Sequence, residues 1–317
     1  MLIALQIIGG LLMLVAGGEA LVRGAVSIAR ALGIPIIVIG LTIVSLGTSA
    51  PEMVISVHAS LSGHPDIALG NVIGSNIANV LLVLGATALI YPVTVEPDMI
   101  RRDGMLMVLV TVLLVIFMAT GVLTRLEGGI FLAVMAGYLF YLWRTVRSGK
   151  NKELVEELKE ETDVHYPTWL ACVMLAAGLG LLMLGADILV GGASDFARIL
   201  GVTEGVIGLT IVAVGTSAPE LVTCVVAAYR RHSDIAIGNV VGSNLFNIFA
   251  VLGVASVIAP IPVSPQFWEV DIWIAVAVSL ILLPIMLTGK TVSRLEGGLL
   301  LAGYIAYTLY QYTIGAQ

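Results

Sequence analysis

The chain has 317 residues, of which 59% are hydrophobic and only 11% charged, with a mean hydropathy of +1.06 and a formal net charge of −6. Soluble globular proteins carry about 25% charged residues, so this composition excludes an ordinary cytosolic domain, a nucleic-acid-binding protein, a disulfide-rich secreted module and a disordered chain. A membrane-spanning helix needs about 20 apolar residues, and the sequence therefore predicts an all-α integral membrane protein.

Ten apolar runs follow one another along the chain, and we interpret each as a transmembrane helix. They lie at about residues 2–22, 34–57, 66–90, 104–120, 126–143, 168–190, 202–228, 235–259, 271–288 and 295–312. One strongly polar and acidic stretch, Ser148–His165, separates the first five runs from the last five. We therefore predict a five-helix repeat over residues 1–147, an acidic linker over 148–166 and a second five-helix repeat over 167–317.

The two halves of the chain repeat each other. Residues 64–71 read HPDIALGN and residues 232–239 read HSDIAIGN, while Gly-Thr-Ser-Ala-Pro-Glu occurs at both 47–52 and 215–220. Because five helices cross a membrane an odd number of times, the second half must enter it from the opposite side. Inverted repeats of this kind are typical of transporters, with the substrate site between the repeats near the midplane.

The distribution of basic residues predicts the orientation in the membrane. Of the 15 Lys and Arg residues, all but Arg125 and Arg198 fall in or beside the loops that follow runs 1, 3, 5, 7 and 9. Cytoplasmic loops carry an excess of Lys and Arg. We therefore expect an integral protein of the plasma membrane (the cell inner membrane), with both termini outside and the 148–166 linker in the cytoplasm.

Polar motifs interrupt four of the apolar runs. The proline of Gly-Thr-Ser-Ala-Pro-Glu removes a backbone donor, so runs 2 and 7 are predicted to be broken helices. Irregular backbone at this depth is tolerated where it lines a cavity. Helical geometry at the spacing of Thr48, Ser49 and Glu52 places their oxygens on one face. In runs 3 and 8, Asn, Ser and Asn recur every four residues, at 71, 75 and 79 and again at 239, 243 and 247.

Two intramembrane carboxylates, Glu52 and Glu220, indicate what these motifs do. An ionised side chain at the bilayer centre costs at least about 2.5–3.5 kcal/mol, and neither run contains a Lys or Arg near its glutamate, so each needs a proton or a metal ion. Carboxylate, hydroxyl and amide oxygens form a hard ligand set that suits Ca²⁺ and Na⁺ rather than zinc or copper. The alternative is that the Ser, Thr and Asn side chains only hold neighbouring helices together by hydrogen bonds.

These motifs resemble the two α-repeats of the cation/calcium exchanger superfamily, especially its prokaryotic sodium/calcium exchanger branch. The resemblance implies ten transmembrane helices in two inverted five-helix repeats, with broken helices 2 and 7 at the ion site. It also implies that the two glutamates bind Ca²⁺ and that motif hydroxyls and amides help to bind Na⁺. By position, the implied ligands are Glu52, Glu220, Thr48, Thr216, Ser49, Ser217, Ser75, Ser243, Asn79 and Asn247, with backbone carbonyls near Ser45 and Ala213.

The expected function is secondary active antiport of Na⁺ against Ca²⁺ by alternating access, which would be electrogenic with the three Na⁺ per Ca²⁺ that the resemblance implies. Relatives in the potassium-dependent branch have Asp where this chain has Asn247, which argues against a need for K⁺. We expect no enzyme activity, no cofactor, and no partner beyond small cations and the bilayer, with neither nucleic acid nor another protein involved. A proton/calcium exchanger is the alternative. A cation channel is more remote, and so is an intramembrane hydrolase, for which the sequence lacks a nucleophile with its base.

Overall fold

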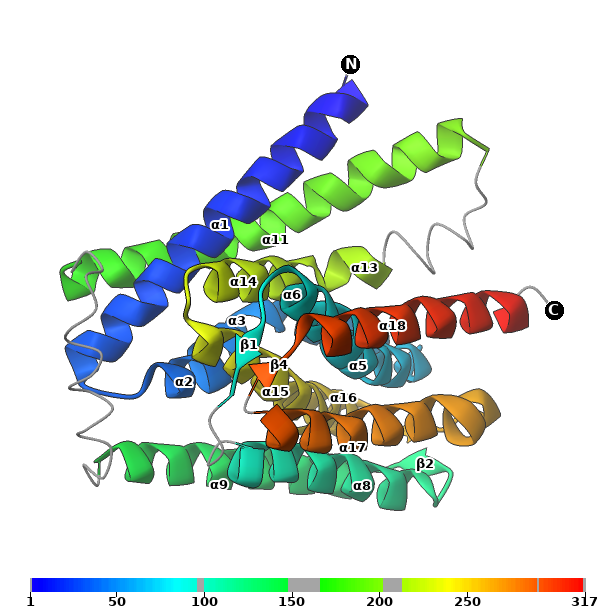
Figure 1. Cartoon of the computed structure of the whole chain (residues 1–317). Helices are drawn as coiled ribbons and strands as arrows, with labels where there is room; N and C mark the ends of the chain where they lie inside the picture. The colour runs from blue at the N-terminus through cyan, green and yellow to red at the C-terminus, as the bar shows by residue number, and fades with distance from the viewer. Residues whose placement is uncertain (1, 96–99, 148–165, 202–212, 290, 316–317) are drawn as a thin grey trace.

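The computed structural model of the chain describes residues 2–95, 100–147, 166–201, 213–289 and 291–315, which are nearly all helical (Figure 1). Within these residues, six helices are long and apolar enough to cross a membrane, or seven if the bent pair Ile36–Thr48 and Ala50–Leu61 is one span. The predicted all-α membrane architecture is therefore confirmed. The count of ten spans stays a prediction, because part of run 7 and most of the linker, residues 148–165, lie outside the described residues.

Corresponding elements follow the same order in the two halves. The first half contains α1 Leu2–Leu32, α2 Ile36–Ile39, η1 Gly40–Val44, α3 Ser45–Thr48, α4 Ala50–Leu61, α5 Pro65–Ala78, η2 Asn79–Leu84, α6 Gly85–Ile90, β1 Val93–Thr94, η3 Ile100–Gly104, α8 Met105–Met118, β2 Val122–Leu123 and α9 Arg125–Arg147. The second half contains α11 Thr168–Ile199, α13 Ala213–Thr216, α14 Ala218–Tyr229, α15 Ser233–Phe246, η5 Asn247–Leu252, α16 Gly253–Ile258, β3 Ile261–Pro262, η6 Phe267–Asp271, α17 Ile272–Gly289, β4 Thr291–Val292 and α18 Arg294–Gly315. The η segments are π-helical turns, which often mark functional sites.

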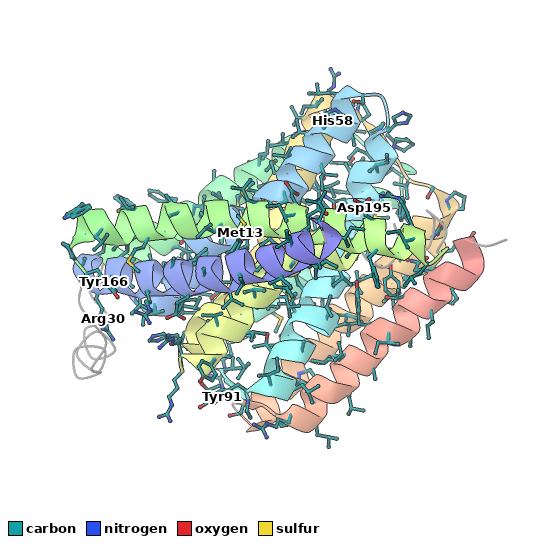
Figure 2. All side chains as sticks on the ribbon, turned by 90° about the horizontal axis from the view of Figure 1, so that it is seen from above. Met13, Arg30, His58, Tyr91, Tyr166 and Asp195 are labelled. Atoms are coloured by element: carbon teal, nitrogen blue, oxygen red, sulfur yellow. The ribbon has the colours of Figure 1, made fainter. Side chains whose placement is uncertain are left out.

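The long helices α1 and α11 lie side by side along one face of the molecule (Figure 1). Arg30, near the end of α1, and Tyr166, just before α11, lie at the same end of the pair, so the two helices run antiparallel (Figure 2). Their backbones touch through glycines, since a Cβ built on Gly17 would lie 2.9 Å from the Gly178 carbonyl oxygen. Small residues allow such close contact between helices. Both helices extend beyond the predicted runs, to Leu32 and Ile199.

Contacts between the halves occur twice, with the roles of the two halves exchanged. Strand β1 pairs with β4, and the corresponding strand β3 pairs with β2, both antiparallel. Likewise α6 packs on α18 through Gly85 and Gly297, and the corresponding α16 packs on α9 through Gly253 and Gly128. A two-fold relation between two similar units produces reciprocal contacts of this kind. The polar motifs of both halves are thereby brought together at the centre of the molecule.

Both predicted helix breaks are present. Helix α3 ends at Thr48 and α4 begins at Ala50, and the two segments meet at an angle of 45°. In the second half, α13 ends at Thr216 and α14 begins at Ala218. The intervening residues Ser49 and Ser217 have nearly the same backbone angles, with φ/ψ of −82°/8° and −86°/4°. Each motif proline falls in the first turn of the new helix, where a missing N–H leaves no helical bond unmade.

Candidate cation-binding site

The two motif glutamates are buried at the start of corresponding helices. Glu52 lies in the first turn of α4 and Glu220 in the first turn of α14, with exposed fractions of 1% and 2%. The N-terminus of a helix carries a partial positive charge that stabilises a nearby carboxylate. Each helix break thus does two things, because it exposes backbone groups at membrane depth and provides a helix N-terminus beside a glutamate.

Hydroxyl groups from the first half surround the glutamate of the second half. Ser49 Oγ donates a hydrogen bond to Glu220 Oε1 at 3.5 Å, and the Thr48 hydroxyl also faces this carboxyl group. Glu220 in turn lies close enough to Glu52 for their charges to interact, and the Ser75 hydroxyl faces the Glu52 carboxyl group. The break at Ser49 falls between Thr48 and Glu52, and their common helix face stays a prediction.

Three buried oxygen atoms of the predicted ligands have no hydrogen-bond partner among the described residues. They are Glu52 Oε2, Glu220 Oε2 and Asn247 Oδ1. A buried polar atom without a partner costs about 1–3 kcal/mol, and more if the group is charged. Within the described part of the chain, no three His, Cys, Asp or Glu side chains are grouped to hold a metal. A cation at these oxygens would therefore depend on hydroxyl, amide or backbone oxygens for its other ligands, which is the hard-ligand chemistry of Ca²⁺ and Na⁺.

Four asparagines form a reciprocal clasp between α5 and α15 and the π-helical turns that follow them. Asn79 Nδ2 donates to Asn244 Oδ1 at 3.1 Å, and Asn247 Nδ2 donates to Asn76 Oδ1 at 3.0 Å. The clasp occupies the amide nitrogens of Asn79 and Asn247, so their oxygens are the ends left for a ligand. Asn76 and Asn244 are not among the ligands predicted from the sequence, and in the structure they hold the predicted ligands Asn247 and Asn79. Their identical position in the two repeats, one residue after each motif serine, was the available signal.

A second polar cluster, where α3 meets α15, contains the predicted ligands Ser45 and Ser243, whose hydroxyls donate to backbone and amide oxygens. Ser45 Oγ donates to the Gly40 carbonyl at 2.6 Å. Ser243 Oγ donates to Asn239 Oδ1 at 3.5 Å, and this oxygen also accepts a hydrogen bond from Thr48 Oγ1 at 3.0 Å. The Thr48 contact, together with longer hydrogen bonds from Ser45 Oγ to the Gly238 and Asn239 carbonyls at 3.4 and 3.3 Å, holds the first broken helix against α15. Ala213 is the first residue of α13, so its backbone lies one turn before Ser217.

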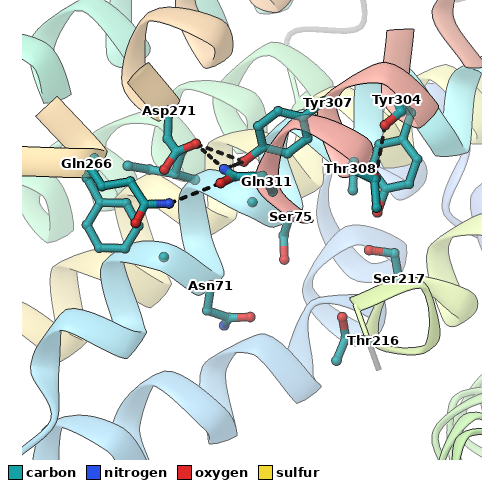
Figure 3. A pocket seen from close by; sticks show the side chains of 15 residues that line it. Asn71, Ser75, Thr216, Ser217, Gln266, Asp271, Tyr304, Tyr307, Thr308 and Gln311 are labelled. Carbon is teal, nitrogen blue, oxygen red and sulfur yellow. Dashed lines mark hydrogen bonds between the residues drawn. The ribbon is translucent and has the colours of Figure 1, made fainter. Parts of the chain in front are cut away.

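The remaining predicted ligands line a cavity of about 290 Å³. Asn71, Ser75, Thr216 and Ser217 lie at one end of this cavity, and a second polar group that includes Asp271 lies at the other (Figure 3). Asn71 and Thr216 are partly exposed there. The symmetry-related residues Asn239 and Thr48, in contrast, are 0% and 1% exposed. In this conformation the site is therefore approached from the side where α18 ends, and the equivalent route through the other half is closed.

Comparison with known proteins agrees with this geometry. The family described as "Sodium/calcium exchanger protein" matches residues 2–144 and 170–313. The chain belongs to this family. The exchanger is 43% identical over 305 residues to CaxA of Alkalimonas amylolytica, covering 94% of this chain and 95% of that protein. It is 35% identical over 342 residues to the sodium/calcium exchanger MaX1 of Methanosarcina acetivorans, covering 96% and 97%.

A solved structure has the same fold. The sodium-calcium exchanger NCX_Mj, soaked without Na⁺ and Ca²⁺, superimposes with a TM-score of 0.81 and 32% sequence identity, covering 96% of this chain and 97% of NCX_Mj. The family consists of exchangers rather than enzymes. These similarities support an integral membrane protein that exchanges calcium against another cation and confirm the family inferred from the sequence motifs.

Proposed function

We propose that this exchanger is a Na⁺/Ca²⁺ antiporter in which Glu52 and Glu220 bind either one Ca²⁺ or several Na⁺. The observation that supports this most strongly is a pair of buried Oε2 atoms, one from each half of the chain, that have no hydrogen-bond partner among the described residues. Two carboxylates offer Ca²⁺ full charge compensation within a low-dielectric site. Because both ions use the same carboxylates, they exclude each other, which is the requirement for exchange rather than joint passage.

The predicted ligand set is proposed as one continuous site. Ser49 and Thr48 reach Glu220, Ser75 reaches Glu52, and the asparagine clasp orients Asn79 and Asn247. The other proposed ligands are Thr216, Ser217 and Ser243 with the carbonyls near Ser45 and Ala213. Cations enter through the cavity beside Thr216 and Ser217, whereas the symmetry-related route is closed. Alternating access follows if the two halves exchange these open and closed arrangements.

The paired helices α1 and α11 are the elements that we propose to move. They contact each other through glycines along their length, and Gly18 of α1 lies against Val222 and Val226 of α14. Helix α14 begins with Ser217 as its cap and carries Glu220 in its first turn. Sliding of the pair along α14 would therefore be transmitted directly to the ion ligands. We propose that the chain is divided into two five-helix repeats, residues 1–147 and 167–317, which the 148–166 linker joins.

Charge counting gives the proposed electrical behaviour. One Ca²⁺ neutralises Glu52 and Glu220, whereas three Na⁺ would leave the loaded site one unit positive, because Asn79 and Asn247 are neutral. Moving one net charge through 100 mV corresponds to about 2.3 kcal/mol. Exchange should then depend on the membrane potential. The positive-inside distribution of Lys and Arg supports an orientation in the plasma membrane with both termini outside and the linker in the cytoplasm. In that orientation a sodium gradient would drive calcium out of the cell.

Calcium uptake into proteoliposomes tests the proposal. Vesicles loaded with Na⁺, with K⁺ or with an imposed pH gradient are compared at a clamped potential. We expect uptake only with internal Na⁺, and faster uptake when the interior is positive, since net positive charge leaves. Uptake driven by the pH gradient alone would instead identify a proton/calcium exchanger. Calcium flux without any counter-ion would identify a channel.

A further inference from the structure

The end of the cavity farther from the glutamates contains a polar group that no proposed ion ligand explains (Figure 3). Asp271, the last residue of η6, accepts hydrogen bonds at Oδ1 from Tyr307 Oη at 3.1 Å and from the amide nitrogen of Gln311. Gln266 Nε2 donates to Gln311 Oε1 at 3.0 Å and so fixes that amide. Both hydrogen bonds to Asp271 end on Oδ1. Within the described residues, Oδ2 therefore keeps its lone pairs for another ligand.

The symmetry-related aspartate is in a different electrostatic situation. Asp103 receives two hydrogen bonds from Arg102, at 2.9 and 2.7 Å, and one from Tyr138 at 3.0 Å, and its side chain is fully buried. Arg102 neutralises this carboxylate. The position that corresponds to Arg102 in the second half is Val270, so the described chain provides Asp271 with two neutral donors and no cationic partner. The two halves thus have the same aspartate, but only the first half pairs it with an adjacent arginine.

The composition of the cavity wall allows the negative charge of Asp271 to attract cations. Among the described residues that line the cavity, Asp271 is the only carboxylate, and none of them is Lys, Arg or His. A cleft with low-dielectric walls and one sign of charge focuses the field and raises the local concentration of counter-ions. Carboxylate, phenol and amide oxygens are also ligands that Na⁺ and Ca²⁺ accept.

We propose that Asp271 forms a separate cation-capture site at this end of the cavity, which concentrates Na⁺ and Ca²⁺ before they reach Glu52 and Glu220. A cation there binds Asp271 Oδ2 and keeps part of its water shell, because the neighbouring Tyr307 and Gln311 are occupied with Oδ1. The site acts on one side of the membrane only, since the corresponding Asp103 is neutralised by Arg102. This inference rests on the proposed cation exchange and adds a residue that controls access to it.

Two substitutions test the site from different directions. Asp271→Asn removes the charge and keeps the shape, and Val270→Arg gives the second half the arginine that neutralises the aspartate in the first half. Glu269→Gln is the matched control, because Glu269 is an exposed carboxylate two residues away that does not line the cavity. Calcium uptake is measured in right-side-out and inside-out membrane vesicles, which present Ca²⁺ to the two faces separately, at low ionic strength and in 1 M choline chloride.

At low ionic strength we expect both test variants to raise the apparent KM for Ca²⁺ on the cavity side by about tenfold, the lower range of electrostatic steering. The difference should shrink in 1 M salt, where the Debye length is about 3 Å, and the KM on the opposite face should not change. Glu269→Gln should match the wild type. An unchanged cavity-side KM in Asp271→Asn, or an equal shift in Glu269→Gln, would overturn the inference. A wild type that exchanges no calcium would refute the proposed function instead.

Discussion

Replacing either buried glutamate by glutamine should affect Ca²⁺ more than Na⁺. Glu52→Gln and Glu220→Gln each keep the size of the side chain and remove one negative charge from the shared site. The affected Oε2 atoms are buried and have no partner among the described residues, so no neighbouring donor compensates for the change. Each variant leaves a divalent ion facing a single carboxylate.

Coulomb's law sets the scale of this loss. A unit charge and a monovalent ion about 4 Å apart interact by about 4 kcal/mol at an effective dielectric constant near 20, and a divalent ion by about twice as much. The energy of desolvation and the remaining amide oxygen offset part of this lost interaction energy. Removing one partner of a buried charge pair typically costs about 3–5 kcal/mol. For Ca²⁺ this corresponds to about a 10²- to 10⁴-fold weaker affinity. The expected loss for each Na⁺ is about half as large in free energy.

Two measurements on the purified exchanger report the weaker Ca²⁺ binding of the variants. Calcium uptake into Na⁺-loaded proteoliposomes should fall to background at micromolar Ca²⁺ in both variants. Thermal melting in detergent reports binding independently, because a ligand present at 100 times its Kd stabilises the folded state by about 2.7 kcal/mol. Ca²⁺ should therefore raise the Tm of the wild type and not that of the variants. Without Ca²⁺ the variants should be at least as stable as the wild type, because they lack one buried carboxylate.

Glu127→Gln provides the matched control. Glu127 lies in the first turn of α9, where Oε2 accepts hydrogen bonds from the Thr124 backbone N–H at 2.6 Å and the Thr124 hydroxyl at 3.0 Å. Glutamine makes the same capping-box contacts, so this variant removes a carboxylate without touching the ion site. It should retain uptake and the Ca²⁺-dependent Tm shift. Wild-type uptake and an undiminished Tm shift in both glutamate variants would refute the assignment of Glu52 and Glu220.

Three further predictions concern packing, ion specificity and topology. Gly178→Ala should lower the free energy of unfolding by about 1–3 kcal/mol, because the new Cβ would lie 2.6 Å from the Leu21 backbone nitrogen. Melting in detergent measures this loss of stability. The control Gly180→Ala, whose Cβ would have nothing within 4 Å, should be neutral. Asn247→Asp places a carboxylate oxygen at a buried position that has no hydrogen-bond partner among the described residues. It should make calcium uptake respond to K⁺, which the wild type should not require, and equal uptake by the variant with and without K⁺ would contradict this. A single cysteine at position 148 should react with an impermeant reagent only after cells are permeabilised.

The local chemistry of the motifs determined much of the fold and the site. Apolar runs of about 20 residues predict membrane helices because lipid cannot satisfy backbone hydrogen bonds. Pro51 and Pro219 determined where two of these helices break, since proline cannot continue the hydrogen-bond ladder of a helix interior. The unneutralised Glu52 and Glu220 indicated a cation site for an energetic reason that needs no structure. The repeated motifs predicted that the second half would mirror the first.

Only the tertiary structure decided which residues act together. Ser49 contacts Glu220 rather than Glu52, and Asn247 is held by Asn76, because α-helices about 170 residues apart pack against each other at the centre of the fold. Such contacts depend on interhelical geometry, and no sequence spacing encodes it. The difference between the two routes to the site has the same origin. Repeats with nearly identical motifs have nearly equal local preferences, so the conformation that opens the cavity beside Thr216 and closes the equivalent route beside Thr48 is a property of the packed assembly.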